Sequence, residues 1–369
     1  MQAIVAPRIA TLDILRLFAA LAVVGYHYFF RAAAGSPILM DVEYPAIAPF
    51  AIYGYLGVNL FFLISGYVIA WSAEGRTAIE FAVARFVRIY PGFVVCMTIS
   101  ALVLVLAADP QLPASLGQYI ANLAIFSPAL GQPFIDGVYW SIVLELVFYG
   151  WVAIAIVTGV FASLRLEFIA AMLIASAINE GFVGSGALRL VLLTDFAPLF
   201  ALGMLTQYIH SRGVSPESML LAIAAFALTF ANATIGRDWM AAHYGVALPN
   251  DALIIANAAN VALFLAALAV GPRVGSSAVT IAIGGLTYPL YLLHQHIGYV
   301  AIPKLAPWLG TVGAAFAVIG AMLIASWLVW RLVERPVQPV LKRLLTRFID
   351  KAIAIAGRAR PASLPSVQP

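Results

Sequence analysis

The sequence is poor in charge and in cysteine. Only 10% of its 369 residues are Asp, Glu, Lys or Arg, whereas a typical soluble domain carries about 25%. Cys96 is the single cysteine, which excludes a disulfide framework and a cysteine-based metal site. Glycine-rich phosphate loops and the His-Glu-x-x-His pattern are also absent. We therefore expect no bound metal ion.

Apolar residues, in contrast, occur in long runs. The hydrophobic share is 63% and the mean hydropathy is +1.00, which is more apolar surface than a water-soluble domain of this size can bury. A helix needs about 20 apolar residues to cross a bilayer, and no alternating barrel pattern is present. The sequence therefore predicts an all-α polytopic membrane protein with about ten transmembrane helices. The predicted spans are 10–30, 48–73, 89–108, 139–161, 166–179, 190–209, 218–235, 251–271, 278–302 and 307–330.

Basic residues set the predicted orientation, because cytoplasmic loops carry most of the Lys and Arg near membrane spans. With the N-terminus inside, 15 basic residues fall on the cytoplasmic side, four fall outside, and Arg16 lies within the first span. Both termini are therefore predicted to be cytoplasmic. The four outer basic residues are Arg31, Arg189, Arg237 and Lys304.

We divide the chain into a transmembrane domain, residues 9–336, and a C-terminal segment, residues 337–369. Within that segment, residues 337–353 alternate apolar and basic side chains at helical spacing. This pattern predicts a basic amphipathic helix on the inner membrane surface, with anionic lipid as its partner. Residues 357–369 are expected to be disordered. The net charge of +4 needs no further partner, and we expect no nucleic-acid binding.

Ionisable side chains inside apolar spans are candidates for function, because each costs roughly 2.5–3.5 kcal/mol or more at bilayer depth. The first span carries Asp13, Arg16 and His27. Arg16 and His27 are eleven residues apart, so they share a helix face at a separation of about 16 Å. An alternative interpretation pairs Asp13 with Arg16 as a capping ion pair and leaves His27 at the interface.

Two later spans carry further candidates. Trp140, Ser141 and Glu145 lie in the fourth span, and His294 lies in the ninth span after Tyr288. The predicted orientation puts His27, Glu145 and His294 all in the outer half of the membrane. Ionisable groups at one depth indicate a shared site, although a lone histidine in an apolar helix is more often a packing residue.

Arg85 and Arg88 precede the third predicted span. They are one helical turn apart, and two guanidinium groups at this spacing can fork around a phosphate. A positive-inside anchor is the simpler alternative for the pair taken alone.

Six short motifs follow one another over residues 9–337. Together they resemble the membrane-bound acyltransferase-3 family, which includes bacterial surface-polysaccharide O-acetyltransferases. The motifs are Arg16-x10-His27, Phe61-Phe62-Leu63-Ile64-Ser65-Gly66-Tyr67, Arg85-x-x-Arg88-Ile89-x-Pro91, Trp140-Ser141-x-x-x-Glu145-x-x-Phe148-Tyr149, Tyr288-x-x-Tyr291-Leu292-x-His294 and Glu334-Arg335-Pro336.

The resemblance implies an enzyme of the bacterial inner membrane that moves an acyl group, usually acetyl, from cytoplasmic acyl-CoA to an acceptor hydroxyl. By similarity His27 is catalytic, with Arg16 needed beside it, and Arg85 and Arg88 hold the CoA phosphates. The acceptor that the resemblance implies is a cell-envelope or exported carbohydrate, or a lipid-linked sugar. A secreted small molecule such as a macrolide is an alternative acceptor, and a transporter or flippase is the alternative class of protein.

The chemistry of these residues suits acyl transfer. A histidine whose pKa lies near 6.5 is a fitting base for a sugar hydroxyl, so we expect His27 to take the acceptor proton while Glu145 orients a histidine or stabilises its imidazolium. The pantetheine arm of CoA is expected to run past Arg16. The catalytic candidates are His27, Glu145, Arg16 and His294; the CoA-binding candidates are Arg85, Arg88, Arg16 and Ser65; the substrate or oxyanion candidates are Trp140, Ser141 and Tyr288, with His294 and Ser65 as further oxyanion donors.

Overall fold

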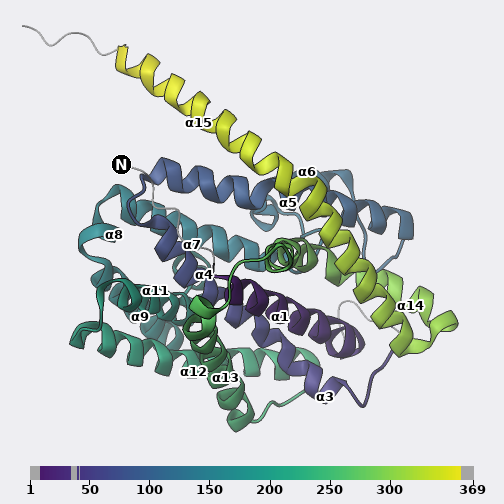
Figure 1. The fold of residues 1–369 in the computed structure, drawn as a ribbon. Coiled ribbons are helices and arrows are strands. Elements are labelled where there is room, and N and C mark those ends of the chain that lie inside the picture. The colour runs from purple at the N-terminus through teal and green to yellow at the C-terminus, as the bar shows by residue number, and fades with distance from the viewer. Residues whose placement is uncertain (1–8, 35–39, 41, 359–369) are drawn as a thin grey trace, which may run out of the picture.

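The computed structural model describes residues 9–34, 40 and 42–358, and this part of the chain is helical without a strand (Figure 1). The longer elements are α1 (Ala10–Tyr26), α4 (Gly57–Ala73), α5 (Ala78–Ala107), α6 (Leu116–Leu123), α7 (Tyr139–Val157), α9 (Arg165–Ile178), α10 (Gly186–Leu192), α11 (Ala197–Arg212), α12 (Pro216–Tyr244), α13 (Asn250–Val270), α14 (Ala278–Val329) and α15 (Arg335–Arg358). The short elements are α2 (Ala32–Ala34), α3 (Ala48–Ala51), α8 (Val160–Ser163), and the π or 3-10 turns η1 (His27–Arg31), η2 (Ile52–Leu56), η3 (Ser127–Leu130), η4 (Asn179–Val183), η5 (Gly271–Arg273) and η6 (Trp330–Glu334).

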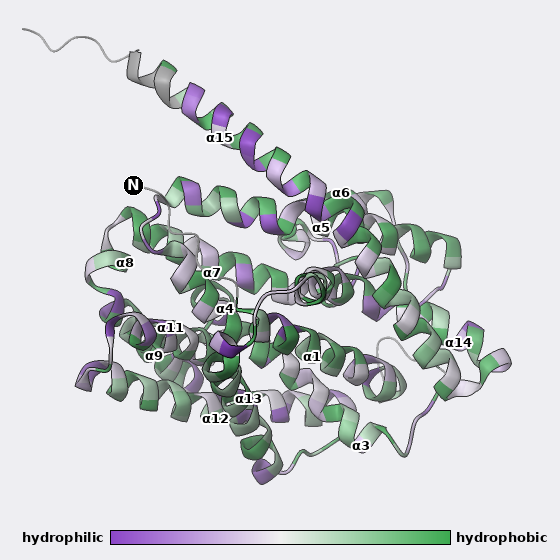
Figure 2. Ribbon diagram, viewed as in Figure 1, coloured by the Kyte–Doolittle hydropathy of each residue, from purple (hydrophilic) through white to green (hydrophobic). Residues whose placement is uncertain are grey.

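Nine helices in the described residues are long and apolar enough to cross a membrane. Figure 2 shows apolar residues along most of their length. The last of them, Ala278–Ala352, contains both the ninth and the tenth predicted span. Gly310, near the start of the tenth predicted span, has a non-helical backbone (φ 71°, ψ 163°), a conformation that glycine adopts without steric cost. The prediction of an all-helical polytopic membrane protein is confirmed.

The third span begins earlier than predicted. We expected it to start at residue 89, but α5 begins at Ala78 and encloses Arg85, Arg88 and Pro91. Thr77 caps this helix: its side chain accepts a hydrogen bond from the Glu80 amide, and the Glu80 carboxylate accepts one from the Thr77 amide. A search for apolar runs misses such a start, because the first turns of α5 carry charge.

The core of the bundle is formed by α1, α4, α11 and α14. Helices α4 and α11 pack against each other, and α1 lies against both α4 and α14. A Cβ atom on Gly66 would lie 2.2 Å from the Phe200 carbonyl oxygen, and one on Gly203 would lie 2.2 Å from the Leu63 carbonyl oxygen. These two glycines therefore allow the α4 and α11 backbones to touch, as small residues do between membrane helices.

The C-terminal helix α15 extends away from the bundle (Figure 1). It contains the predicted amphipathic segment and begins at Arg335, two residues before the predicted start. Apolar Val340, Leu344 and Phe348 are exposed along it. The predicted disordered tail lies largely outside the described residues, and the membrane orientation stays a prediction.

Candidate active site

Two cavities lie within the bundle. The first, here called the arginine cavity, has a volume of about 260 Å³ and is bordered by Arg16, Ser65, Arg85, Arg88, Ser141, Glu145, Tyr149 and Tyr288. The second, the histidine cavity, has a volume of about 570 Å³ and is bordered by His27, Arg31, Trp140, Arg189, Asp195 and Gln295. Val58 and Tyr291 border both cavities, so the two spaces adjoin there.

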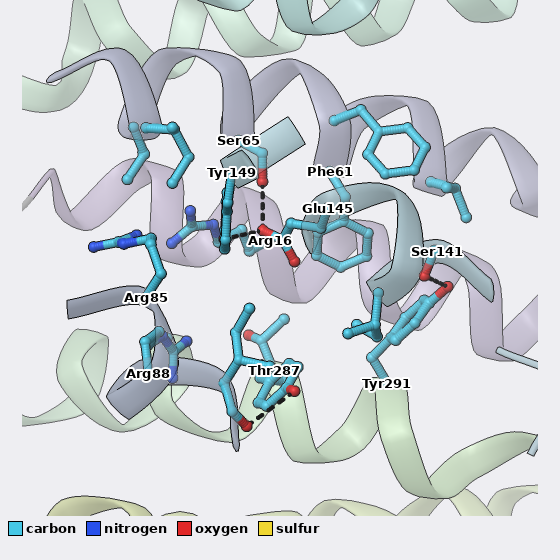
Figure 3. Close-up of a pocket in the computed structure, with 18 residues that line it drawn as sticks. Arg16, Phe61, Ser65, Arg85, Arg88, Ser141, Glu145, Tyr149, Thr287 and Tyr291 are labelled. Carbon is cyan, nitrogen blue, oxygen red and sulfur yellow. Dashed lines mark hydrogen bonds between the residues drawn. The ribbon is translucent and has the colours of Figure 1, made fainter. Parts of the chain in front are cut away.

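Glu145 is the carboxylate of the arginine cavity, and its hydrogen bonds come from neighbouring hydroxyl groups. Ser65 Oγ donates to Glu145 Oε1 at 3.0 Å, and Tyr149 OH donates to the same oxygen at 2.5 Å. Figure 3 shows Arg16 beside this group. Glu145 thus lies among the cationic groups of the arginine cavity.

Arg88 is held in place by a buried carboxylate. Its Nη1 atom lies 3.2 Å from Glu334 Oε2, and only 1% of the Glu334 side chain is exposed. The guanidinium also lies over the Tyr288 ring, 5.6 Å from its centroid. A Cβ atom on Gly92 would come within 2.3 Å of Glu334 Oε1. Gly92 therefore makes room for the carboxylate that fixes Arg88.

Arg85 has no such counter-charge. Its guanidinium lies over the Phe81 and Tyr149 rings, 5.9 and 5.8 Å from their centroids. No salt bridge joins it to a carboxylate in the described part of the chain, and its Nε atom is buried without a hydrogen-bond partner there. Arg85 is half-buried, and a cation that is partly withdrawn from water without an anionic partner is costly, so the cavity is suited to an anionic ligand at this point.

His27 borders the histidine cavity and is paired with His294 behind it. The backbone of α1 changes from α to π at His27, the first residue of η1, and such π turns are frequent at functional sites. His27 Nδ1 lies 2.9 Å from His294 Nε2. Tyr28 OH donates to the His294 carbonyl oxygen at 2.6 Å, which ties η1 to α14. The predicted proximity of His27 and His294 is therefore present in the structure.

The hydrogen bonds define the protonation of this pair when both rings are neutral. His294 Nδ1 lies 2.8 Å from the Tyr291 carbonyl oxygen and 3.2 Å from that of Leu290. A carbonyl oxygen only accepts, so His294 Nδ1 carries hydrogen and His294 Nε2 is an acceptor. His27 Nδ1 must then donate to it. The remaining nitrogen of His27, Nε2, keeps its lone pair and can act as a base.

Glu145 does not belong to this pair, and the expectation that it orients a histidine is wrong. Its hydrogen bonds go to Ser65 and Tyr149, and it borders the arginine cavity while His27 borders the histidine cavity. The membrane depth of Glu145 was read from its place along a span. The depth of a residue in the membrane does not predict which neighbouring helix it faces, because that depends on how the helices pack.

The remaining predicted residues divide between the two cavities. Trp140 borders the histidine cavity, whereas its neighbour Ser141 borders the arginine cavity. Ser141 Oγ lies 2.7 Å from Tyr291 OH, so this hydroxyl pair stands where the cavities adjoin. Ser65 is bonded to Glu145, and Tyr288 OH donates to the Ile89 carbonyl oxygen at 3.2 Å.

Sequence reasoning missed several cavity residues. Arg31 and Arg189 were counted only as outer loop charges, yet both border the histidine cavity, as does Asp195. Their closeness to predicted span ends was the available signal, because ionisable groups at membrane depth are functional candidates. Tyr291 belongs to a predicted motif that assigns it no role, yet it borders both cavities. Glu334 also belongs to such a motif, and the structure shows that it fixes Arg88.

His296 is explained by the structure as an anchor. Its Nδ1 donates to the Ile135 carbonyl oxygen at 2.8 Å, and its Nε2 accepts from the Gly137 amide at 3.3 Å. The Asp136 carboxylate accepts from the His296 and Val138 amides at 2.9 and 3.2 Å. These bonds fasten the segment before α7 to α14, next to the histidine pair.

Known proteins place this chain in a family. The acyltransferase-3 family model, described as an acyltransferase domain, matches residues 9–331. Acyltransferase MdmB from Streptomyces mycarofaciens is 31% identical over 150 residues, which are 38% of each chain. The match therefore spans well under half of that relative. No solved structure matches the chain. Because the family model covers most of the sequence, the chain belongs to the acyltransferase-3 family, and its long apolar helices are those of a multi-pass membrane protein.

Proposed function

We propose that this protein transfers an acetyl group from acetyl-CoA to a hydroxyl of a cell-envelope or exported carbohydrate, in the bacterial inner membrane with both termini in the cytoplasm. The observation that carries the proposal is the arrangement of the cavities: a cationic cavity meets a second cavity that contains a histidine with a free lone pair. Acyl transfer from CoA to an alcohol needs a cationic site for the phosphates of the donor and a base on the acceptor side.

The arginine cavity is the proposed donor site. Arg85, without a counter-ion, and Arg88, fixed by Glu334, offer two cations to the phosphates of CoA. The volume of about 260 Å³ is below the 300–1,000 Å³ common for whole small-molecule sites, which suits the narrow pantetheine arm. Figure 3 shows Arg85 and Arg88 on one side and Ser141 and Tyr291 on the other. The arm then runs from the arginines past Arg16 toward Tyr291.

The histidine pair is the proposed base. The acceptor oxygen attacks the thioester carbonyl carbon while its proton passes to His27 Nε2. The C–S bond of the tetrahedral intermediate then breaks, and the CoA sulfur leaves with the proton from His27. His294 keeps the correct tautomer of His27 by accepting from Nδ1, so it is a positioning residue. The Ser141 and Tyr291 hydroxyl pair, located where the cavities adjoin, is the proposed source of a hydrogen bond to the oxyanion.

The test is transfer of radiolabelled acetyl from acetyl-CoA by the purified protein in lipid nanodiscs, with a bacterial envelope extract as acceptor. His27→Ala should lower the transfer rate by about 10²- to 10⁴-fold, the usual contribution of a general base. His243→Ala is the matched control, because His243 is exposed on α12 and borders neither cavity. Label on a small secreted molecule instead of a carbohydrate would change the acceptor class. Full activity of His27→Ala would refute the mechanism.

A further inference from the structure

The histidine cavity contains a carboxylate that the proposed mechanism does not use. Asp195 is the one Asp or Glu among the residues that border this cavity in the described part of the chain. It lies in the short segment between α10 and α11. The Phe196 amide donates to Asp195 Oδ1 at 3.1 Å, and no salt bridge joins Asp195 to an arginine or lysine among the described residues. Its carboxylate can therefore accept hydrogen bonds from a ligand.

The segment that carries Asp195 is rigidly built. Leu193, which is 1% exposed, has a left-handed backbone with φ 57°, a conformation that a branched residue adopts only when its surroundings impose it. Asn232 Nδ2 donates to the carbonyl oxygens of Thr194 and Asp195, both at 3.0 Å. This side chain from α12 clamps the turn, so Asp195 is held at the cavity wall.

The neighbouring arginine, Arg189, is paired with a second carboxylate. Glu180 Oε2 lies 2.7 Å from Arg189 Nη2, and Glu180 Oε1 accepts from Thr194 Oγ1 at 2.5 Å. The charge of Arg189 is therefore compensated within η4 and α10. Arg31 lies over the Tyr244 and Tyr299 rings, 5.9 and 5.7 Å from their centroids. Because Glu180 compensates Arg189 and Asp195 has no salt bridge among the described residues, this part of the cavity disfavours a strongly anionic ligand.

Aromatic rings border the same cavity beside the carboxylate. Trp140 and Phe196 have ring centroids 5.7 Å apart, and Phe196 directly follows Asp195. Aromatic faces pack against the apolar C–H face of a sugar ring, while a carboxylate accepts from hydroxyls at its edge. A volume of about 570 Å³ is within the usual range for a small-molecule site.

We propose that Asp195 binds hydroxyl groups of the acceptor and makes the enzyme select neutral polyols over alcohols with one hydroxyl. This inference rests on the proposed function, because it concerns the acceptor of the same reaction. His27 stands at the same cavity as Asp195. Binding at Asp195 would hold one part of the sugar while another hydroxyl meets the base.

The experiment compares two acceptors of similar size, with the full-length protein in nanodiscs and labelled acetyl-CoA as donor. A panel of methyl hexosides supplies polyols, and cyclohexylmethanol supplies a single hydroxyl. Asp195→Ala should raise the KM for the hexosides about tenfold or more, because hydrogen bonds to charged groups are the stronger ones. The KM for cyclohexylmethanol should change less than twofold. Asp195→Asn, which keeps one acceptor oxygen, should give an intermediate KM for the hexosides.

The matched control is Asp238→Asn, an exposed aspartate paired with Arg237 on α12. An equal rise of KM for both acceptors would overturn the inference, because a structural defect acts on both. An unchanged hexoside KM in Asp195→Ala would also overturn it, as would wild-type transfer to cyclohexylmethanol without transfer to any hexoside. The first two results leave the proposed function intact, whereas the third also counts against a carbohydrate acceptor. In contrast, absence of label on every hydroxyl, in the wild type as in His27→Ala, would count against the proposed function itself.

Discussion

Replacement of His294 tests whether the histidine pair works through its tautomer. In the structure His294 Nε2 accepts from His27 Nδ1 at 2.9 Å. His294→Leu removes this acceptor and leaves the Nδ1–H of His27 without that partner. The ring can then turn or carry its hydrogen on Nε2, and in either state the lone pair needed by the acceptor hydroxyl is misplaced.

The expected size of the effect follows from the lost hydrogen bond. An unsatisfied buried donor costs about 1–3 kcal/mol, and each 1.36 kcal/mol changes a rate tenfold. The rate of acetyl transfer, kcat, should therefore fall roughly 5- to 150-fold in His294→Leu. This loss is smaller than that of His27→Ala, because the base itself remains.

His294→Gln provides the matched control and the refuting result. A glutamine side chain carries an amide oxygen that can accept from His27 Nδ1, so this variant should keep most of the wild-type kcat. Steady-state transfer from labelled acetyl-CoA measures all three proteins. The reasoning fails if the leucine variant has the wild-type kcat, or if glutamine is as harmful as leucine.

Three further predictions concern the donor site and α15. Arg85→Gln should raise the KM for acetyl-CoA by about tenfold or more, since a charge-assisted hydrogen bond to phosphate is lost, whereas Arg76→Gln, which borders neither cavity, should not. Gly92→Ala should raise the KM for acetyl-CoA several-fold with kcat retained, because its Cβ would displace the Glu334 carboxylate from Arg88. Gly150→Ala is the control, because Gly150 has open space around it. Equal KM values for the two variants would contradict the prediction. Trypsin should cut α15 several-fold more slowly in anionic than in neutral nanodiscs, since each basic residue near an anionic surface contributes about 1 kcal/mol; equal cleavage rates would refute lipid binding.

The fold was largely predictable because the bilayer fixes the length of each span. Ten apolar runs predicted the helices, and the non-helical backbone at Gly310, inside the tenth predicted run, was not predicted. The start of α5 was not predictable from hydropathy, because its first turns contain Glu80, Arg85 and Arg88 and are set by the Thr77 cap. Hydropathy predicts only the apolar part of a helix. A helix whose first turns are charged therefore begins earlier than its apolar run.

The sequence predicted the membrane depth of the site residues better than the direction in which each side chain faces around its helix. His27 and His294 share a depth and meet, whereas Glu145, assigned to the same depth, borders another cavity. A span gives the height of a residue, but the neighbour that it faces depends on helix packing. Asp195 was not predicted either, because it lies in a short segment between helices. Its hydrogen bond from Asn232, which holds it at the cavity, joins residues 37 positions apart and cannot be predicted from local sequence.

The separation of the two cavities explains why Arg16 and His27 occur on one helix. Arg16 borders the arginine cavity and His27 borders the histidine cavity, and eleven residues of helix correspond to about 16 Å. A CoA donor is anchored by its phosphates at one end and reacts at the other end. The length of the molecule therefore sets where its thioester carbonyl lies. In the proposed mechanism α1 sets that distance, and Tyr291, which borders both cavities, is the proposed place where the thioester meets the base.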